Sequence, residues 1–151
     1  MATRAQSNTP VHLWIVGILS LLWNGFGCYD YFMTQTKGAA YIESMMPGAD
    51  SAAIMAYMNG LPAWETALWA FGVWGGLLGS ALLLARHRWA VIALGVSMLG
   101  AVLGIGYQLI NPAPIADMHK GMNAAMPYVI IIVAVGLFLY ARAMEKKGVL
   151  S

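Results

Sequence analysis

The chain has 151 residues, of which 60% are hydrophobic and 9% are charged, and its mean hydropathy is +0.69. Soluble domains usually contain about 25% charged residues, so this composition excludes an ordinary soluble protein and indicates one integral membrane domain, residues 1–151. The net charge of +2 comes without a basic run of the kind that follows phosphates, so we expect no nucleic-acid partner.

Four apolar stretches predict four membrane-spanning helices. A helix needs about 20 mostly apolar residues to cross the hydrocarbon layer. We place the spans at about residues 12–33, 62–85, 89–110 and 124–142. Strands would leave peptide groups unpaired in lipid, so the expected fold class is all-α, an antiparallel four-helix transmembrane bundle. Pro127 would lie in the first turn of the fourth span, where proline is tolerated.

The connection between spans 1 and 2 carries helix punctuation of its own. Residues 38–46 form one helical stretch that ends at Pro47 and Gly48. A second stretch begins after a cap at Asp50 or Ser51 and runs to Gly60. Apolar residues recur on one face of this second stretch. We therefore expect two short amphipathic helices at the membrane surface.

The basic residues set the expected orientation. One side would hold six of the eight basic residues, which are Arg4, Arg86, Arg88, Arg142, Lys146 and Lys147. The other side would hold Lys37 and Lys120 with five of the six acidic residues, which are Asp30, Glu43, Asp50, Glu65 and Asp117. By the positive-inside rule, both termini are expected in the cytoplasm.

Small residues in spans 2 and 3 predict how the helices pack. Lipid supplies no hydrophobic drive between helices, so close backbone approach at small residues matters. The candidate packing residues are Gly72, Gly76, Gly79, Gly100 and Gly104. They favour tight packing within the span 2–3 hairpin, and the alternative is a seam between copies of the chain.

Polar residues near the ends of the first three spans suggest a shallow polar cup on the outer side. Its candidate residues are Asn24, Tyr29, Asp30, Gln35, Trp64, Glu65, Tyr107, Gln108 and Asn111. Asn24 lies near mid-bilayer, where it joins helices or contacts a ligand. Asp30 and Glu65 are either hydrated carboxylates or groups drawn below the headgroups.

Methionines concentrate on the predicted outer side. Met118, Met122 and Met126 recur every four residues, and His119 is adjacent. Thioethers and imidazole are soft ligands, so Met118, His119 and Met122 form a candidate Cu(I) site. The alternative is ordinary packing by a flexible side chain.

Catalytic motifs are missing from the sequence. The lone Cys28 has no histidine within its own span, and no paired carboxylates, metalloprotease motif or phosphate-binding loop is present. We therefore expect neither an enzyme nor a bound cofactor.

Several short segments resemble a family of small four-span bacterial membrane proteins. The segments are Leu22-Trp23-Asn24, Gly27, Asp30-Tyr31, Met33-Thr34-Gln35, Pro62-Ala63-Trp64 and Gly72-Val73-Trp74-Gly75. Some members of this family carry the label "sugar transporter", and the DoxX-like proteins are similar in size and layout. The resemblance implies a bacterial inner membrane.

These observations lead to a functional expectation. We expect a non-catalytic accessory, scaffold or assembly subunit embedded in the lipid bilayer, as a homo-oligomer or as part of a larger membrane complex. The alternative is a small-solute transporter that acts as an oligomer, and Cu(I) binding on the outer side is a third possibility.

Overall fold

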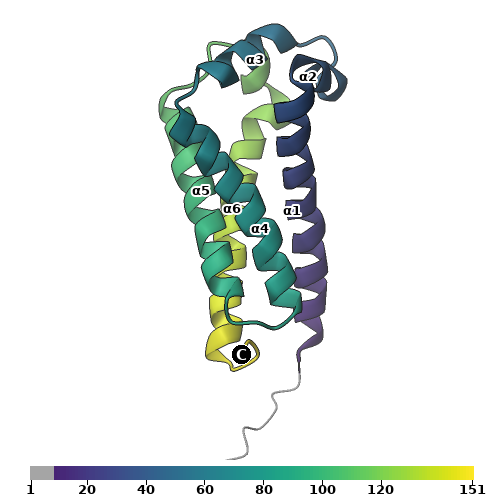
Figure 1. Cartoon of the computed structure of the whole chain (residues 1–151), viewed down its shortest axis with the longest axis vertical. Helices are drawn as coiled ribbons and strands as arrows, with labels where there is room; N and C mark the ends of the chain where they lie inside the picture. The colour runs from purple at the N-terminus through teal and green to yellow at the C-terminus, as the bar shows by residue number, and fades with distance from the viewer. Residues whose placement is uncertain (1–8) are drawn as a thin grey trace, which may run out of the picture.

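The computed structural model describes residues 9–151, and all regular structure within them is helical (Figure 1). The helices are α1 (Val11–Lys37), α2 (Ala39–Met45), α3 (Ser51–Gly60), α4 (Ala63–Leu84), α5 (Ala90–Ile110), the 3-10 turn η1 (Ala116–His119) and α6 (Gly121–Lys146). Four of them, α1, α4, α5 and α6, are long and apolar enough to cross a membrane, which confirms the predicted all-α four-helix bundle. Arg4 lies outside the described residues.

Two of the long helices continue beyond the predicted spans. α1 runs on to Lys37 and ends where Gly38 takes a positive φ of 54°, and α6 begins at Gly121 and ends at Lys146. The prediction followed the apolar stretch alone. A helix continues through the headgroup region until a residue such as glycine turns the chain.

Pro127 is not in the first turn of its helix, and that expectation was wrong. Because α6 begins at Gly121, Pro127 is its seventh residue and lies inside the helix. Proline has no amide hydrogen, so the Asn123 carbonyl loses its usual partner four residues on. The first residues of α6 include Gly121 and Asn123, so hydropathy alone did not identify where this helix starts.

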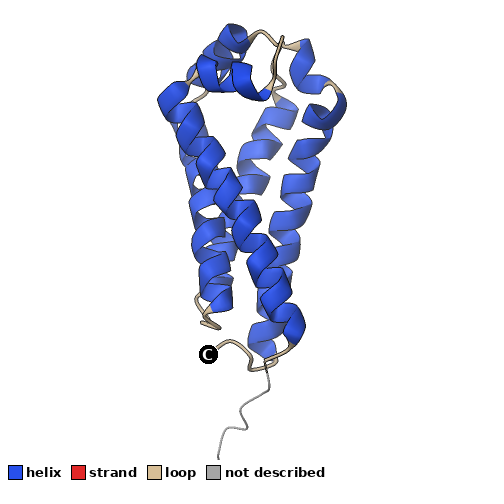
Figure 2. Cartoon of the chain, turned by 90° about the vertical axis from the view of Figure 1, so that its right-hand side faces the viewer, coloured by secondary structure: helices blue, strands red, loops and turns tan. Residues whose placement is uncertain are grey.

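The short helices α2 and α3 lie across one end of the bundle, as Figures 1 and 2 show. The start of α3 is fixed as the sequence suggests, because the Asp50 carboxylate accepts a hydrogen bond of 2.9 Å from the Ala53 amide. On the inner face of α3, Ile54 is buried. We call this end, which carries α2 and α3, the acidic end, and the opposite end, with the α4–α5 turn, the basic end.

The long helices neighbour one another in the order α1, α4, α5 and α6. α4 lies between α1 and α5, and α6 packs on α5. Side chains of α1 and α6 meet at the basic end, where His12 forms a hydrogen bond with the Tyr140 hydroxyl. Only Ala141 and Met144 are buried in α6, so α6 is the most exposed of the four long helices.

The main apolar core lies at the basic end. Leu13, Leu83 and Leu94 are almost completely buried there, together with Met144. The last residues of the chain also enter this core, because Val149 and Leu150 are buried in it. The Ser151 amide donates to the Arg86 carbonyl at 2.9 Å, and the Arg88 amide donates to the Ser151 carbonyl at 3.2 Å. The C-terminal segment is thereby attached to the α4–α5 turn.

The backbones of α4 and α5 make the closest helix contact. A Cβ atom added to Gly100 would lie 2.6 Å from the Leu68 carbonyl oxygen and 2.7 Å from the Gly72 amide nitrogen. A Cβ atom on Gly75 would lie 3.1 Å from the Ala93 carbonyl oxygen. These neighbours are backbone atoms that cannot rotate away. The absence of side chains at these glycines therefore allows the two helices to touch.

The other candidate packing glycines lie against side chains. Gly76 faces the Asn24 amide and the Ser97 hydroxyl, and Gly79 faces Leu94. A Cβ atom on Gly104 would lie 3.6 Å from both carboxylate oxygens of Glu65. These three glycines provide space for polar and apolar groups of neighbouring helices.

Gly100→Ala should destabilise the bundle by about 1–3 kcal/mol, since the added methyl group overpacks rigid backbone. Gly106→Ala is the matched control on the same helix, because no atom lies within 4 Å of a Cβ atom there. The free energy of unfolding, measured by denaturing-detergent titration in mixed micelles, should fall for the first variant and stay equal or rise for the second. Equal effects would contradict the proposed contact.

Candidate functional site

Polar side chains in the middle of the bundle connect three helices. The Asn24 amide nitrogen donates to the Ser20 carbonyl at 2.9 Å and to the Ser80 hydroxyl at 3.0 Å, which joins α1 to α4. The Ser97 hydroxyl donates to the Gly72 carbonyl at 2.6 Å and joins α5 to α4. We call Asn24, Ser80 and Ser97 the interhelical polar cluster. The Asn24 amide nitrogen and both serine hydroxyls are engaged with other groups of the same chain.

Cys28 adds another contact at the α1–α4 boundary. Its thiol is buried and donates to the Val73 carbonyl at 3.2 Å. Closer to the acidic end, Tyr31 and Trp69 meet edge to face with ring centroids 4.9 Å apart. Polar and aromatic contacts therefore follow the α1–α4 boundary from mid-bundle toward the acidic end.

Glu65 is the most unusual polar group of the structure. It lies in the first turn of α4, where a carboxylate complements the helix dipole, yet its side chain is only 2% exposed. The Gln108 amide nitrogen donates to Oε1 at 2.6 Å. The other oxygen, Oε2, is buried and has no hydrogen-bond partner within residues 9–151. Glu65 is thus a buried carboxylate that is only half satisfied.

Aromatic residues lie near Glu65 at the acidic end. Trp64 and Tyr107 meet edge to face, with ring centroids 4.8 Å apart. The Tyr57 hydroxyl of α3 donates to the Asn111 carbonyl at 3.2 Å. Burial raises the pKa of Tyr57, and the negative charge of Glu65 and the Tyr107 hydroxyl raise it further. We call Tyr57, Trp64, Glu65, Tyr107 and Gln108 the Glu65 site.

Asp30 belongs to a separate group around α2. The Tyr41 hydroxyl donates to the Asp30 carboxylate at 2.9 Å, and the Tyr29 ring meets the Tyr41 ring edge to face. Burial raises the pKa of Tyr41 to about 12, helped by the hydrogen bond and the charge of Asp30. This contact attaches α2 to α1.

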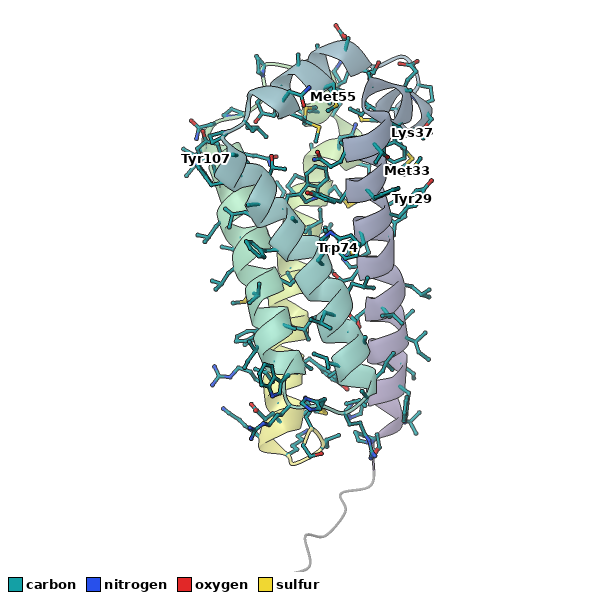
Figure 3. All side chains as sticks on the ribbon, viewed as in Figure 1. Tyr29, Met33, Lys37, Met55, Trp74 and Tyr107 are labelled. Carbon is teal, nitrogen blue, oxygen red and sulfur yellow. The ribbon has the colours of Figure 1, made fainter. Side chains whose placement is uncertain are left out.

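The nine residues expected to form one polar cup do not lie together: eight are distributed over three places, and the ninth lies apart. Asn24 lies in the interhelical polar cluster, Tyr29 and Asp30 lie beside Tyr41, and the span 2 and 3 residues lie around Glu65. Gln35 is exposed. Tyr29 and Tyr107 lie on opposite sides of the acidic end in Figure 3. Within the described chain, no hydrogen bond joins the Asp30 group to the Glu65 site.

Sequence reasoning missed two tyrosines that complete these groups. Tyr57 of α3 and Tyr41 of α2 are not among the candidate residues that the sequence suggests. The phenolic hydroxyl was the feature of the sequence that could have identified these two residues. A tyrosine on an interfacial helix presents an apolar ring to the membrane and still needs a partner for its hydroxyl.

The candidate Cu(I) residues do not lie on one continuous helix. Met118 and His119 belong to η1, whereas Met122 follows an extended Lys120 and lies in the first turn of α6. Met122 is 68% exposed. The His119 Nε2 atom lies 2.7 Å from the Ala113 carbonyl oxygen, so Nε2 is already engaged and only Nδ1 is left for another partner. The four-residue spacing therefore does not translate into one helical face across this break.

Within residues 9–151, no three His, Cys, Asp or Glu side chains come together as a metal-binding group. The chain matches no protein-family model, no curated protein sequence and no solved structure in these comparisons.

Asn24 and Ser80 should show a measurable coupling in a double-mutant cycle. Asn24→Ala and Ser80→Ala should together cost less than the sum of the single changes, with a coupling of about 0.6–2 kcal/mol in unfolding free energy. Asn24→Ala with Thr36→Ala is the control pair and should be additive, since the Thr36 hydroxyl bonds only within its own helix turn. Additivity in both pairs would argue against a hydrogen bond between α1 and α4.

Gln108→Leu should destabilise the bundle by about 1–3 kcal/mol, because it leaves both Glu65 oxygens without a partner. Adding Glu65→Gln should recover part of this loss, since a neutral amide costs less to bury than a carboxylate. Gln35→Leu, at an exposed position, is the control and should change little. The unfolding free energies of the wild type and the three variants test this, and failure of Glu65→Gln to recover stability would contradict it.

Proposed function

We propose that this chain is a non-catalytic scaffold or assembly subunit of a bacterial inner membrane, with both termini in the cytoplasm. The interhelical polar cluster is the observation that carries this proposal. A translocation path needs polar groups that face a moving solute. Here the mid-bundle polar groups hold α1, α4 and α5 together, as a structural role requires.

The charge distribution supports the proposed orientation. Arg86 and Arg88 lie in the α4–α5 turn, and Arg142, Lys146 and Lys147 lie at the same end. Lys37 lies at the opposite end, beside α2 (Figure 3). The excess of basic residues at one end is typical of the cytoplasmic side. The resemblance to small four-span bacterial proteins supports the inner membrane as the location.

The outer face of α6 is the surface that we assign to assembly. It carries exposed residues at helical spacing, which are Tyr128, Ile132, Gly136 and Leu139. Gly136 has no neighbour within 4 Å of an added Cβ atom, so it leaves a notch in this face. A second transmembrane helix packs closely where a glycine interrupts larger side chains.

Gly136→Leu should abolish assembly while the bundle stays folded. Wild-type protein extracted in native-lipid particles should self-associate or bring down a specific partner, and mass analysis should show loss of that species in the variant. Gly106→Leu is the control, since a Cβ atom added there also has no atom within 4 Å, but the position lies on α5. A wild-type protein that is monomeric and without a partner would count against the proposal.

Transport by an oligomer is the second candidate, and the free Oε2 atom of Glu65 favours it. A buried carboxylate oxygen without a partner is a place where a polar solute or cation gains a contact. In this case, Glu65→Gln should lose uptake into proteoliposomes while it still assembles, whereas Gly136→Leu should lose both assembly and uptake. Uptake that is unchanged in Glu65→Gln would remove this site from the candidate pathway.

A further inference from the structure

A recess at the basic end lies between α5 and α6, outside the sites described above. It has a volume of about 510 Å³ and is lined by Arg88, Trp89, Val91, Ile92, Phe138, Arg142 and Glu145. The residues at its mouth come from the α4–α5 turn and from the end of α6. Its wall nearer the membrane is apolar. The recess therefore combines two guanidinium groups with an apolar wall at the level of the membrane surface.

The two guanidinium groups are available for an anion. Within the described residues, neither Arg88 nor Arg142 forms an ion pair with a carboxylate, although Glu145 lines the same recess. The backbone amides of Ala90 and Val91, at the start of α5, are already bonded to carbonyls of the turn. Recognition of an anion therefore falls to the two side chains, and guanidinium groups are well suited to phosphate oxygens.

The apolar wall of the recess also holds the Arg142 side chain in position. The guanidinium carbon of Arg142 lies 5.8 Å from the centre of the Phe138 ring, in a cation–π contact. Phe138, which belongs to α6, in turn packs against α5, since a Cβ atom added to Gly95 would lie 3.3 Å from its ring. Trp89 is 57% exposed beside them and provides an indole at the height of the lipid headgroups.

We infer that this recess binds an anionic phospholipid, with its phosphate between Arg88 and Arg142 and its acyl chains along Val91, Ile92 and Phe138. A free phosphate ion would use the arginines but would gain nothing from the apolar wall. A zwitterionic lipid would use the wall but would bring a choline cation toward two guanidinium groups. Basic pockets between transmembrane helices commonly hold anionic headgroups in this way.

The test is native mass spectrometry of purified full-length protein with dioleoyl phosphatidylglycerol or dioleoyl phosphatidylcholine. Wild-type protein should retain the anionic lipid preferentially. R88Q/R142Q should bind it about twenty-five-fold more weakly, since each contact between a lining guanidinium group and the phosphate is expected to contribute a factor of about five. R88K/R142K keeps the charges and should retain most of the binding.

Two further variants separate a defined site from general attraction. K146Q/K147Q removes the same charge from the same end but leaves the recess lining intact, so its binding should stay within about twofold of wild type. Glu145→Gln removes the one carboxylate of the recess and should strengthen binding. Equal losses in R88Q/R142Q and K146Q/K147Q, no lipid preference in wild type, or complete displacement by inorganic phosphate would each overturn the inference.

Discussion

The close contact between the backbones of α4 and α5 is the constraint on which the bundle depends. Lipid gives these helices no hydrophobic reason to associate, so contact energy must come from atoms that touch and from hydrogen bonds. Gly72 and Gly100 allow the two backbones to touch directly. The short α4–α5 turn already holds the pair together, so little additional entropy is lost when the contact forms. α1 and α6 then pack on the outer sides of this pair.

The same contact determines where polar groups are placed. Because α4 and α5 are so close, the Ser97 hydroxyl reaches the Gly72 carbonyl across the boundary. Near the acidic end, Gly104 leaves room for the Glu65 carboxylate, and Gln108 on the next turn supplies its hydrogen bond. One pattern of small residues thus permits both a tight mid-bundle contact and a buried carboxylate near the membrane surface. The two features are expected to respond together to changes in the α4–α5 distance.

Hydropathy and spacing were sufficient to predict the four long helices, both surface helices and a cap at Asp50 or Ser51, of which the structure uses Asp50, because these depend on local composition. The ends of α1 and α6 were not predictable from apolar length, since helices continue through polar headgroup layers. The residues of the candidate cup lie in separate groups because residues near one membrane face can point to different neighbours. Helix rotation sets that direction, and it depends on packing partners such as Tyr41, which lies on a different helix from Asp30.

The attachment of the C-terminal segment has a practical consequence for anyone who labels this protein. Val149 and Leu150 are buried among α1, α4, α5 and α6 side chains, and Ser151 is paired with the α4–α5 turn. A fluorescent protein or affinity tag fused directly after Ser151 would displace this C-terminal segment and the turn at Arg86 to which it is bonded. The φ of Arg86, 56°, is already unusual for a residue other than glycine. Fusions ahead of α1, or fusions joined through a long flexible linker, would leave the C-terminal segment undisturbed.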